Sequence, residues 1–201
     1  MMKSEQTPRF IVFEGIDGAG KTTQLELAEK AFADAGIPLF RTAEPTSGET
    51  GKLLRKALSG KLQKTPAELA LLFTLDRAEH NKEIERALAD GKTVLCDRYY
   101  YSTIAYQGNA TDPEWVKRMN LDCPEIRTPD LCIFLDLSPD ESIRRISARG
   151  EAAEIYETKA QLTKIRENFL NTLKALPNVH IIDASGSPEE VHGKIKKVLG
   201  L

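Results

Sequence analysis

The chain has 201 residues, of which 41% are hydrophobic and 29% are charged. This balance is typical of a globular domain with a sizeable core and excludes a disordered chain. Its 28 Lys and Arg residues against 30 Asp and Glu residues give a net charge of −2. We therefore expect no nucleic acid or anionic membrane as a partner, because no bulk positive field would hold either one. The apolar runs at 69–73 and 131–135 are far shorter than the ~20 residues of a membrane-spanning helix.

The cysteines and the first residues bear on the compartment. Cys96, Cys123 and Cys132 are odd in number and show no CxxC spacing, and two of them lie in apolar, strand-like runs. Residues 1–9 read MMKSEQTPR, without the apolar segment of a secretory signal. We expect reduced thiols in a cytoplasmic protein.

Strand-like and helix-like segments alternate along the chain. Strands are predicted at 10–13, 37–41, 93–96, 130–136 and 179–182. Helices are predicted from the glycine-rich segment 15–20 to Gly36 and at 52–58, 66–90, 139–149, 153–175 and 188–199. This order favours an α/β fold in which helices cover both faces of a parallel sheet. No Pro- or Ser-rich linker divides the chain, so we expect residues 1–201 to form a single domain.

Residues 15–22 read GIDGAGKT and match the phosphate-binding pattern G-x-x-x-x-G-K-[ST], after a strand and before a helix. Glycines let backbone N–H groups surround phosphate oxygens, and the following helix adds its positive end. We expect Lys21 to reach the β- and γ-phosphates and Thr22 to bind Mg²⁺. The alternative is a glycine turn that happens to precede a lysine. The predicted nucleotide-binding residues are Gly15, Ile16, Asp17, Gly18, Ala19, Gly20, Lys21, Thr22 and Thr23.

A phosphate-binding loop does not name a reaction, because switches, ATPases and kinases share it. Asp97 and Arg98 end a predicted buried strand, at the sheet edge where open α/β proteins bind ligands. Asp97 suits Mg²⁺ or its water, and the fork of Arg98 suits a second phosphate group. The alternative for Arg98 is an ion pair with Asp97.

Two further pairs of side chains have helical spacing. Phe73 and Arg77 share a face of the long helix, where a ring and a guanidinium could stack on and bond to a base. Phe73 could equally fill the core. Ser102 and Tyr106 share one side of a helix that follows Arg98, and could equally form a partly exposed polar face.

Five ordered segments carry a resemblance to a known family. They are FEGIDGAGKTTQ (13–24), EPTSGETGKLLR (44–55), LLFTLDRAEH (71–80), DRYYYSTIAYQG (97–108) and PDLCIFLDLSPDESIRRISARGE (129–151). Together they resemble the thymidylate kinases, which are P-loop nucleoside-monophosphate kinases. The resemblance implies a P-loop NTPase fold with a five-stranded parallel sheet and a small lid segment. It also implies conversion of ATP and dTMP to ADP and dTDP with Mg²⁺, by a homodimer.

The resemblance also implies roles around the acceptor nucleotide. Phe73 is similar to the ring that stacks on thymine, and Arg77 to the contact with a thymine carbonyl oxygen. Gln107 resembles a residue that fixes the base, and Tyr106 the ring that crowds the 2′ position of the sugar. Ser102 is expected beside them.

Further roles concern the phosphates. Arg98 resembles the clamp on the acceptor phosphate, and Asp17 the acid near the acceptor sugar and the metal. Glu44 and Arg55 fall in a segment that lies near the acceptor site in the family.

A lid is expected at about 144–157, and it is the candidate source of catalytic arginines. Arg145 and Arg149 are four residues apart and share a helical face, whereas Arg144 points about 100° away from Arg145. Arginines brought over a nucleotide stabilise the charge of the transition state. Alternatively, these are solvated charges that interact with the end of a helix.

Two rival functions remain open. The chain could be a related P-loop kinase that acts on a deoxynucleoside or on another nucleoside monophosphate. It could also be a nucleotide-binding switch without an acceptor.

Overall fold

The computed structural model describes residues 7–149, 158–174, 176 and 178–201. Its centre is a five-stranded sheet in the order β2-β3-β1-β4-β5, and every neighbouring pair is parallel. The strands are β1 (Phe10–Glu14), β2 (Leu39–Ala43), β3 (Thr93–Asp97), β4 (Leu131–Asp136) and β5 (Val179–Asp183). The predicted parallel α/β sheet is confirmed.

Eight α-helices lie between or after the strands among the described residues. They are α1 (Lys21–Asp34), α2 (Glu49–Leu58), α3 (Pro66–Ala89), α4 (Tyr100–Tyr106), α5 (Pro113–Leu121), α6 (Pro139–Arg149), α7 (Lys159–Leu173) and α8 (Pro188–Leu199). The sequence signals that start α3 act as expected. Thr65 and Glu68 form a reciprocal capping box, with Pro66 in the first turn.

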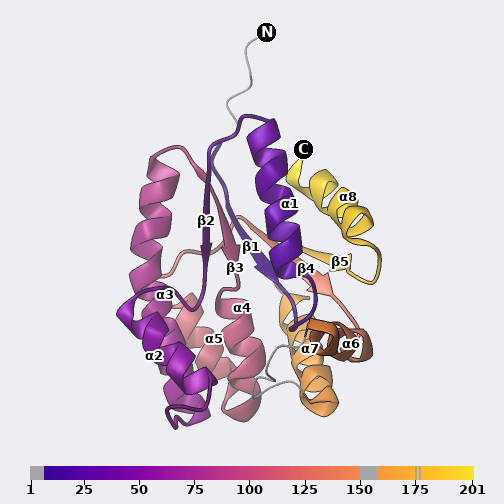
Figure 1. The fold of residues 1–201 in the computed structure, drawn as a ribbon. Coiled ribbons are helices and arrows are strands. Elements are labelled where there is room, and N and C mark those ends of the chain that lie inside the picture. Colours follow the sequence, from indigo (N-terminus) through magenta and orange to yellow (C-terminus); the bar gives the residue numbers. More distant parts are fainter. Residues whose placement is uncertain (1–6, 150–157, 175, 177) are drawn as a thin grey trace.

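The sheet separates two apolar clusters, because successive side chains of a strand point to opposite faces. On one face Ile11 packs with Leu25 of α1 and Ile195 of α8. On the other face Val12 lies in a cluster that includes Phe169 of α7 and residues of α3, α4 and α5. Figure 1 views the molecule from the side of α1. Both faces of the sheet are therefore buried, as continuous apolar strands require.

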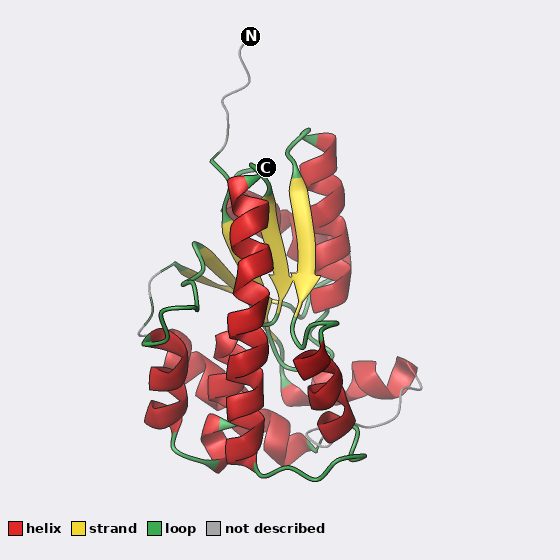
Figure 2. Ribbon diagram, turned by 90° about the vertical axis from the view of Figure 1, so that its left-hand side faces the viewer, coloured by secondary structure: helices red, strands yellow, loops and turns green. Residues whose placement is uncertain are grey.

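The carboxyl ends of the strands form one edge of the sheet. In Figure 2 the strand arrowheads point to the lower half of the molecule, where several helices gather. The segment 15–20, here called the phosphate loop, leaves β1 at this edge and leads into α1. Neighbours of β1 on its two sides are β3 and β4, so the chain reverses its direction of winding at the phosphate loop. At the opposite edge the Arg9 guanidinium donates to the Leu199 carbonyl (2.6 Å) and ties the start of β1 to α8.

Some predicted boundaries were wrong. β2 starts at Leu39 instead of residue 37, because Pro38 has no N–H for the ladder and contributes only its carbonyl, to Thr93. α5 was not predicted. The predicted helix 153–175 appears as α7, and residues 153–157 lie outside the described residues.

Cys96 and Cys132 are buried and Cys123 is half-buried, all three as free thiols. None of the described helices combines the length and the apolar character needed to cross a bilayer.

Two helical glycines differ in what surrounds them. A Cβ at Gly51 of α2 would lie 1.9 Å from the Thr46 carbonyl oxygen, whereas a Cβ at Gly193 of α8 would have no neighbour within 4 Å. We expect Gly51→Ala to lower the melting temperature by forcing the 45–48 segment away from α2. Gly193→Ala, the matched control, should raise stability by about 0.5–1 kcal/mol through helix propensity. Thermal and urea unfolding of both variants test this, and equal effects would contradict the close approach.

Candidate active site

The phosphate loop has a conformation that its glycines permit. Gly15 and Gly18 have φ angles of +151° and +75°, values that side chains disfavour. A Cβ at Gly15 would lie 2.8 Å from the Leu135 carbonyl oxygen, and one at Gly18 would lie 2.8 Å from that of Ser142. No side chain caps the N-terminus of α1, so its first amides remain available for an anion.

Lys21 is buried at the mouth of this loop. Its Nζ donates to the carbonyl oxygens of Gly15 (3.1 Å) and Ile16 (3.3 Å). Burial, and after it the charge of Arg98, lowers the pKa of Lys21 below the ordinary lysine value. The ammonium is therefore poorly solvated, and an arriving phosphate would stabilise its charged form.

Arg98 faces the same loop from the end of β3. Its guanidinium donates to the Gly15 carbonyl (3.2 Å) and to the Ser102 hydroxyl (3.0 Å), and it forms an ion pair with Asp17. Tyr106 donates to the other Asp17 oxygen (3.2 Å). The alternative of an Arg98 ion pair with its neighbour Asp97 does not occur. The structure thus brings the predicted residues Asp17, Ser102 and Tyr106 together around one guanidinium.

Asp17 is ionised in this arrangement. Burial opposes its charge, but the positive charges of Arg98 and Lys21 outweigh that penalty and hold its pKa below the ordinary value. Lys21 and Arg98 therefore place two positive charges beside the loop, and both would attract an anionic ligand.

Glu14, the residue just before the loop, was not predicted. It is fully buried, and its carboxylate accepts from the Tyr99 amide (2.8 Å), the Ser102 amide (3.2 Å) and the Ser102 hydroxyl (2.6 Å). Burial raises the pKa of Glu14 from 4.5 to about 7, although Arg98 favours the charged form. The signal in the sequence was an acidic residue that ends an otherwise apolar strand.

A second buried network holds Arg77 of α3. Its guanidinium donates to Glu44 (2.6 Å), to Thr103 (3.1 Å) and to Asn120 (2.5 Å), and only 1% of the residue is exposed. The second Glu44 oxygen lies 3.0 Å from Nδ1 of His80. Asn120 belongs to the unpredicted α5, so sequence analysis could not place it here. The network fixes the guanidinium in one orientation.

The remaining acceptor-side residues have different environments. Phe73 is partly buried and packs against the cluster of Leu54, Ala57 and Leu69, so its ring has both a packed and an exposed part. Arg55 is exposed and donates to the carbonyl oxygens of Pro45 (2.7 Å) and Thr46.

Gln107 follows α4 and is buried. Its backbone carbonyl accepts from the Thr111 hydroxyl at 2.8 Å. The structure therefore places Gln107 inside the protein, directly after the helix that carries Ser102 and Tyr106.

The two predicted metal ligands lie at the carboxyl edge. Thr22 is exposed in the first turn of α1, and Asp97 ends β3. The Asp97 Oδ1 atom is buried and has no hydrogen-bond partner among the described residues. An orphaned carboxylate oxygen at a ligand-binding edge fits a hard cation such as Mg²⁺.

The helix α6 approaches the loop from the side of β4. Ser142 donates to the Asp17 carbonyl (2.5 Å), and the Arg145 guanidinium lies 3.9 Å from the position of a Cβ at Gly20. Arg145 also donates to the Ala184 carbonyl (3.0 Å). Arg144 is exposed and pairs with Glu141, which also pairs with Arg145.

The last residue of α6 is Arg149, and its side chain lies outside the described part of the structure, as do residues 150–157 of the predicted lid.

The buried carboxyl of Glu14 should make stability depend on pH. A carboxyl whose pKa rises from 4.5 to about 7 on folding binds its proton more tightly in the native state. Its contribution to the unfolding free energy is therefore most favourable below pH 4.5 and is lost as the pH rises to about 7, by on the order of 3 kcal/mol. Urea unfolding at several pH values should show this slope in the wild type and not in Glu14→Gln. Parallel curves would contradict it.

Comparisons with known proteins agree with this geometry. The family model "Thymidylate kinase" matches residues 13–195. A probable thymidylate kinase of Pyrococcus horikoshii is 43% identical over 194 residues, which cover 92% of this chain and 93% of the relative. A thymidylate kinase of Leptospira interrogans is 44% identical over 170 residues, covering 84% and 82%.

The solved structure of thymidylate kinase from Candida albicans has the same fold, with a TM-score of 0.84 at 23% identity, covering 96% of this chain and 92% of that one. This likeness extends to the whole five-stranded architecture. The match of the family model over most of the sequence, and the identities above 40%, show that the chain belongs to the thymidylate kinase family.

Proposed function

We propose that this protein transfers the γ-phosphoryl group of ATP to dTMP and releases ADP and dTDP. The observation that carries the proposal is the position of Arg98, which faces the phosphate loop from the neighbouring strand. A phosphate loop provides for one nucleotide, whereas a guanidinium fork beside it provides for the phosphate of a second. Membership of the thymidylate kinase family supports this activity.

On the donor side, the amides of the phosphate loop, residues 15–20, and those of Thr22 and Thr23 would surround the phosphates of ATP. Lys21 would leave its present carbonyl partners for phosphate oxygens, which are stronger acceptors because they are charged. This exchange relieves the poor solvation that depresses its pKa.

On the acceptor side, the partly exposed ring of Phe73 would stack on thymine, and Arg77 would bond to a base oxygen. Two observations support the role of Arg77. Glu44 and Asn120 hold its guanidinium in place, and its Nε has no partner among the described residues and could donate to the base.

The sugar and the phosphate of dTMP would lie closer to the loop. Tyr106 is held by Asp17 and would crowd the 2′ position. Ser102 would contact the acceptor nucleotide beside Arg98, Gln107 would help to fix the base from within the protein, and Arg55 would border the acceptor site through the 45–46 segment.

We also propose Mg²⁺ as the metal, held by Thr22 and Asp97. No group of three or more acidic, His or Cys side chains that could hold a metal occurs in the parts of the chain that the structure describes. Such a sparse set of ligands suits Mg²⁺, which keeps waters and binds substrate phosphates. When bound, Mg²⁺ neutralises charge on the β- and γ-phosphates.

Phosphoryl transfer needs positioning and positive charge rather than covalent chemistry. Lys21 and Arg98 would hold the two reacting groups in line, and Asp17 would keep Arg98 oriented until the acceptor arrives. Arg145 is close enough to the loop to add charge at the donor, and Arg149 would join it as part of a lid at about 144–157.

We propose a cytoplasmic homodimer in which residues 1–201 of each chain form one kinase domain. Exposed leucines support the dimer: Leu53 lies on α2, and Leu71 and Leu75 lie one turn apart on α3. Apolar side chains that gather on a surface mark an interface more often than isolated ones do.

A panel of acceptors tests the activity. We expect kcat/KM to be highest for dTMP among dTMP, dUMP, dCMP, AMP and thymidine, with ADP release that depends on the acceptor. Lys21→Ala should lower kcat by at least about 10²-fold, the scale for one preorganised donor, while circular dichroism stays unchanged. A preference for thymidine would contradict the acceptor site. Tight nucleotide binding with only slow hydrolysis would indicate a switch instead.

Analytical ultracentrifugation tests the dimer. The wild type should sediment as a dimer, and the double variant Leu71→Arg/Leu75→Arg as a monomer, because two charges would be buried at the interface. Ile181→Arg is the matched control, since Ile181 is also an exposed apolar residue but lies on β5. A monomeric wild type, or dissociation by the control alone, would contradict an interface on α3.

A further inference from the structure

The donors around Glu14 define the direction of a hydrogen-bond chain. The Ser102 hydroxyl has a single proton, which it donates to Glu14 at 2.6 Å. Its lone pairs therefore face away from Glu14, and one of them accepts from the Arg98 guanidinium at 3.0 Å. A carboxylate behind the hydroxyl thus makes the hydroxyl an acceptor toward Arg98.

Glu14 also acts on the backbone that carries Arg98. Arg98 has a φ of +66°, in the left-handed region that non-glycine residues rarely adopt. Such a conformation persists only where its neighbours fix it. The Arg98 amide donates to the Phe13 carbonyl (2.9 Å), and the next amide, that of Tyr99, donates to Glu14 (2.8 Å). β1 therefore fixes the peptide units on both sides of the strained residue.

The same carboxylate serves the start of α4. The N-cap residue Tyr99 provides no side-chain acceptor, and Glu14 reaches from β1 to the Ser102 amide at 3.2 Å. One buried side chain therefore holds the turn, the helix start and the hydroxyl that surround Arg98.

We propose that Glu14 is a positioning residue for the acceptor phosphate: through Ser102 and the turn at Tyr99, its carboxylate aims Arg98 at the place that this phosphate occupies. This inference rests on the proposed function and adds a residue that touches neither nucleotide. Its specific consequence is that Glu14 matters for the phosphate of the acceptor and not for its base or sugar.

The test compares two ligands that differ only in that phosphate. The dissociation constants of dTMP and thymidine, and separately of ATP, are measured by calorimetry for the wild type and for Glu14→Gln. The amide of glutamine removes the charge, and only its oxygen can accept, so its NH₂ group leaves part of the present set of donors without an acceptor. We expect dTMP to bind about 10-fold more weakly, the scale of one charge-assisted hydrogen bond, and thymidine and ATP to change by less than about 2-fold.

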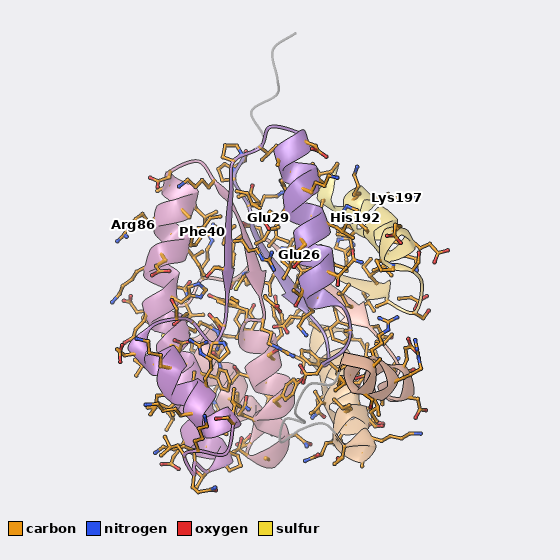
Figure 3. The ribbon with its side chains drawn as sticks, in the orientation of Figure 1. Glu26, Glu29, Phe40, Arg86, His192 and Lys197 are labelled. Carbon is orange, nitrogen blue, oxygen red and sulfur yellow. The ribbon has the colours of Figure 1, made fainter. Side chains whose placement is uncertain are left out.

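Two further variants serve as a control and as a second test of the same hydrogen-bond chain. Glu26→Gln is the matched control, because Glu26 is exposed on α1 (Figure 3) and should leave all three constants unchanged. Ser102→Ala keeps Glu14 and removes only the hydroxyl, so it should weaken the binding of dTMP but not that of thymidine. It replaces Glu14→Gln in the test if that variant does not fold.

Equal losses for dTMP and thymidine, or no loss for either, would overturn the role of Glu14. A wild type that binds dTMP no more tightly than thymidine would overturn the proposed function instead, because then no phosphate clamp exists to be positioned.

Discussion

The parallel pairing of β1 with β3 is the constraint on which the site depends. Phe13 lies opposite Asp97 in this ladder, and the Arg98 amide continues it to the Phe13 carbonyl. The residues that leave the two strands are therefore fixed side by side: the phosphate loop from one, the guanidinium of Arg98 from the other. A one-residue slip of the register would turn every side chain of a strand to the other face. The two apolar clusters on opposite faces of β1 exclude such a slip.

Four ionisable side chains meet beside Asp97 at this edge. Glu14 and Asp17 come from β1 and its loop, Lys21 from α1 and Arg98 from β3. Lys21 and Arg98 bond to loop carbonyls, and Arg98 also pairs with Asp17, so neither buried cation lacks a partner. A phosphate would therefore exchange partners with groups already in place. Phosphoryl transfer depends on preorganised groups of this kind, because the protein contributes mainly positioning and charge.

Most of the fold could be predicted from the sequence, because buried strands, glycine turns and capping boxes are local signals. The phosphate loop and the position of Arg98 at a strand end followed from the same local patterns. The partners of these residues did not. Asn120 meets Arg77 across 43 positions, and Glu14 meets Ser102 across 88. Such contacts depend on how elements pack, which periodicity does not encode. A single acidic residue at the end of an apolar strand is nevertheless a signal in the sequence, because burying it unpaired would be costly.

The hydrogen bond from Arg9 to Leu199 joins the first described strand to the last helix at the edge of the sheet away from the phosphate loop. Polypeptide added at the C-terminus would therefore extend from the side remote from the nucleotides. Immobilising the enzyme or fusing it to a reporter through that end leaves substrate entry unobstructed.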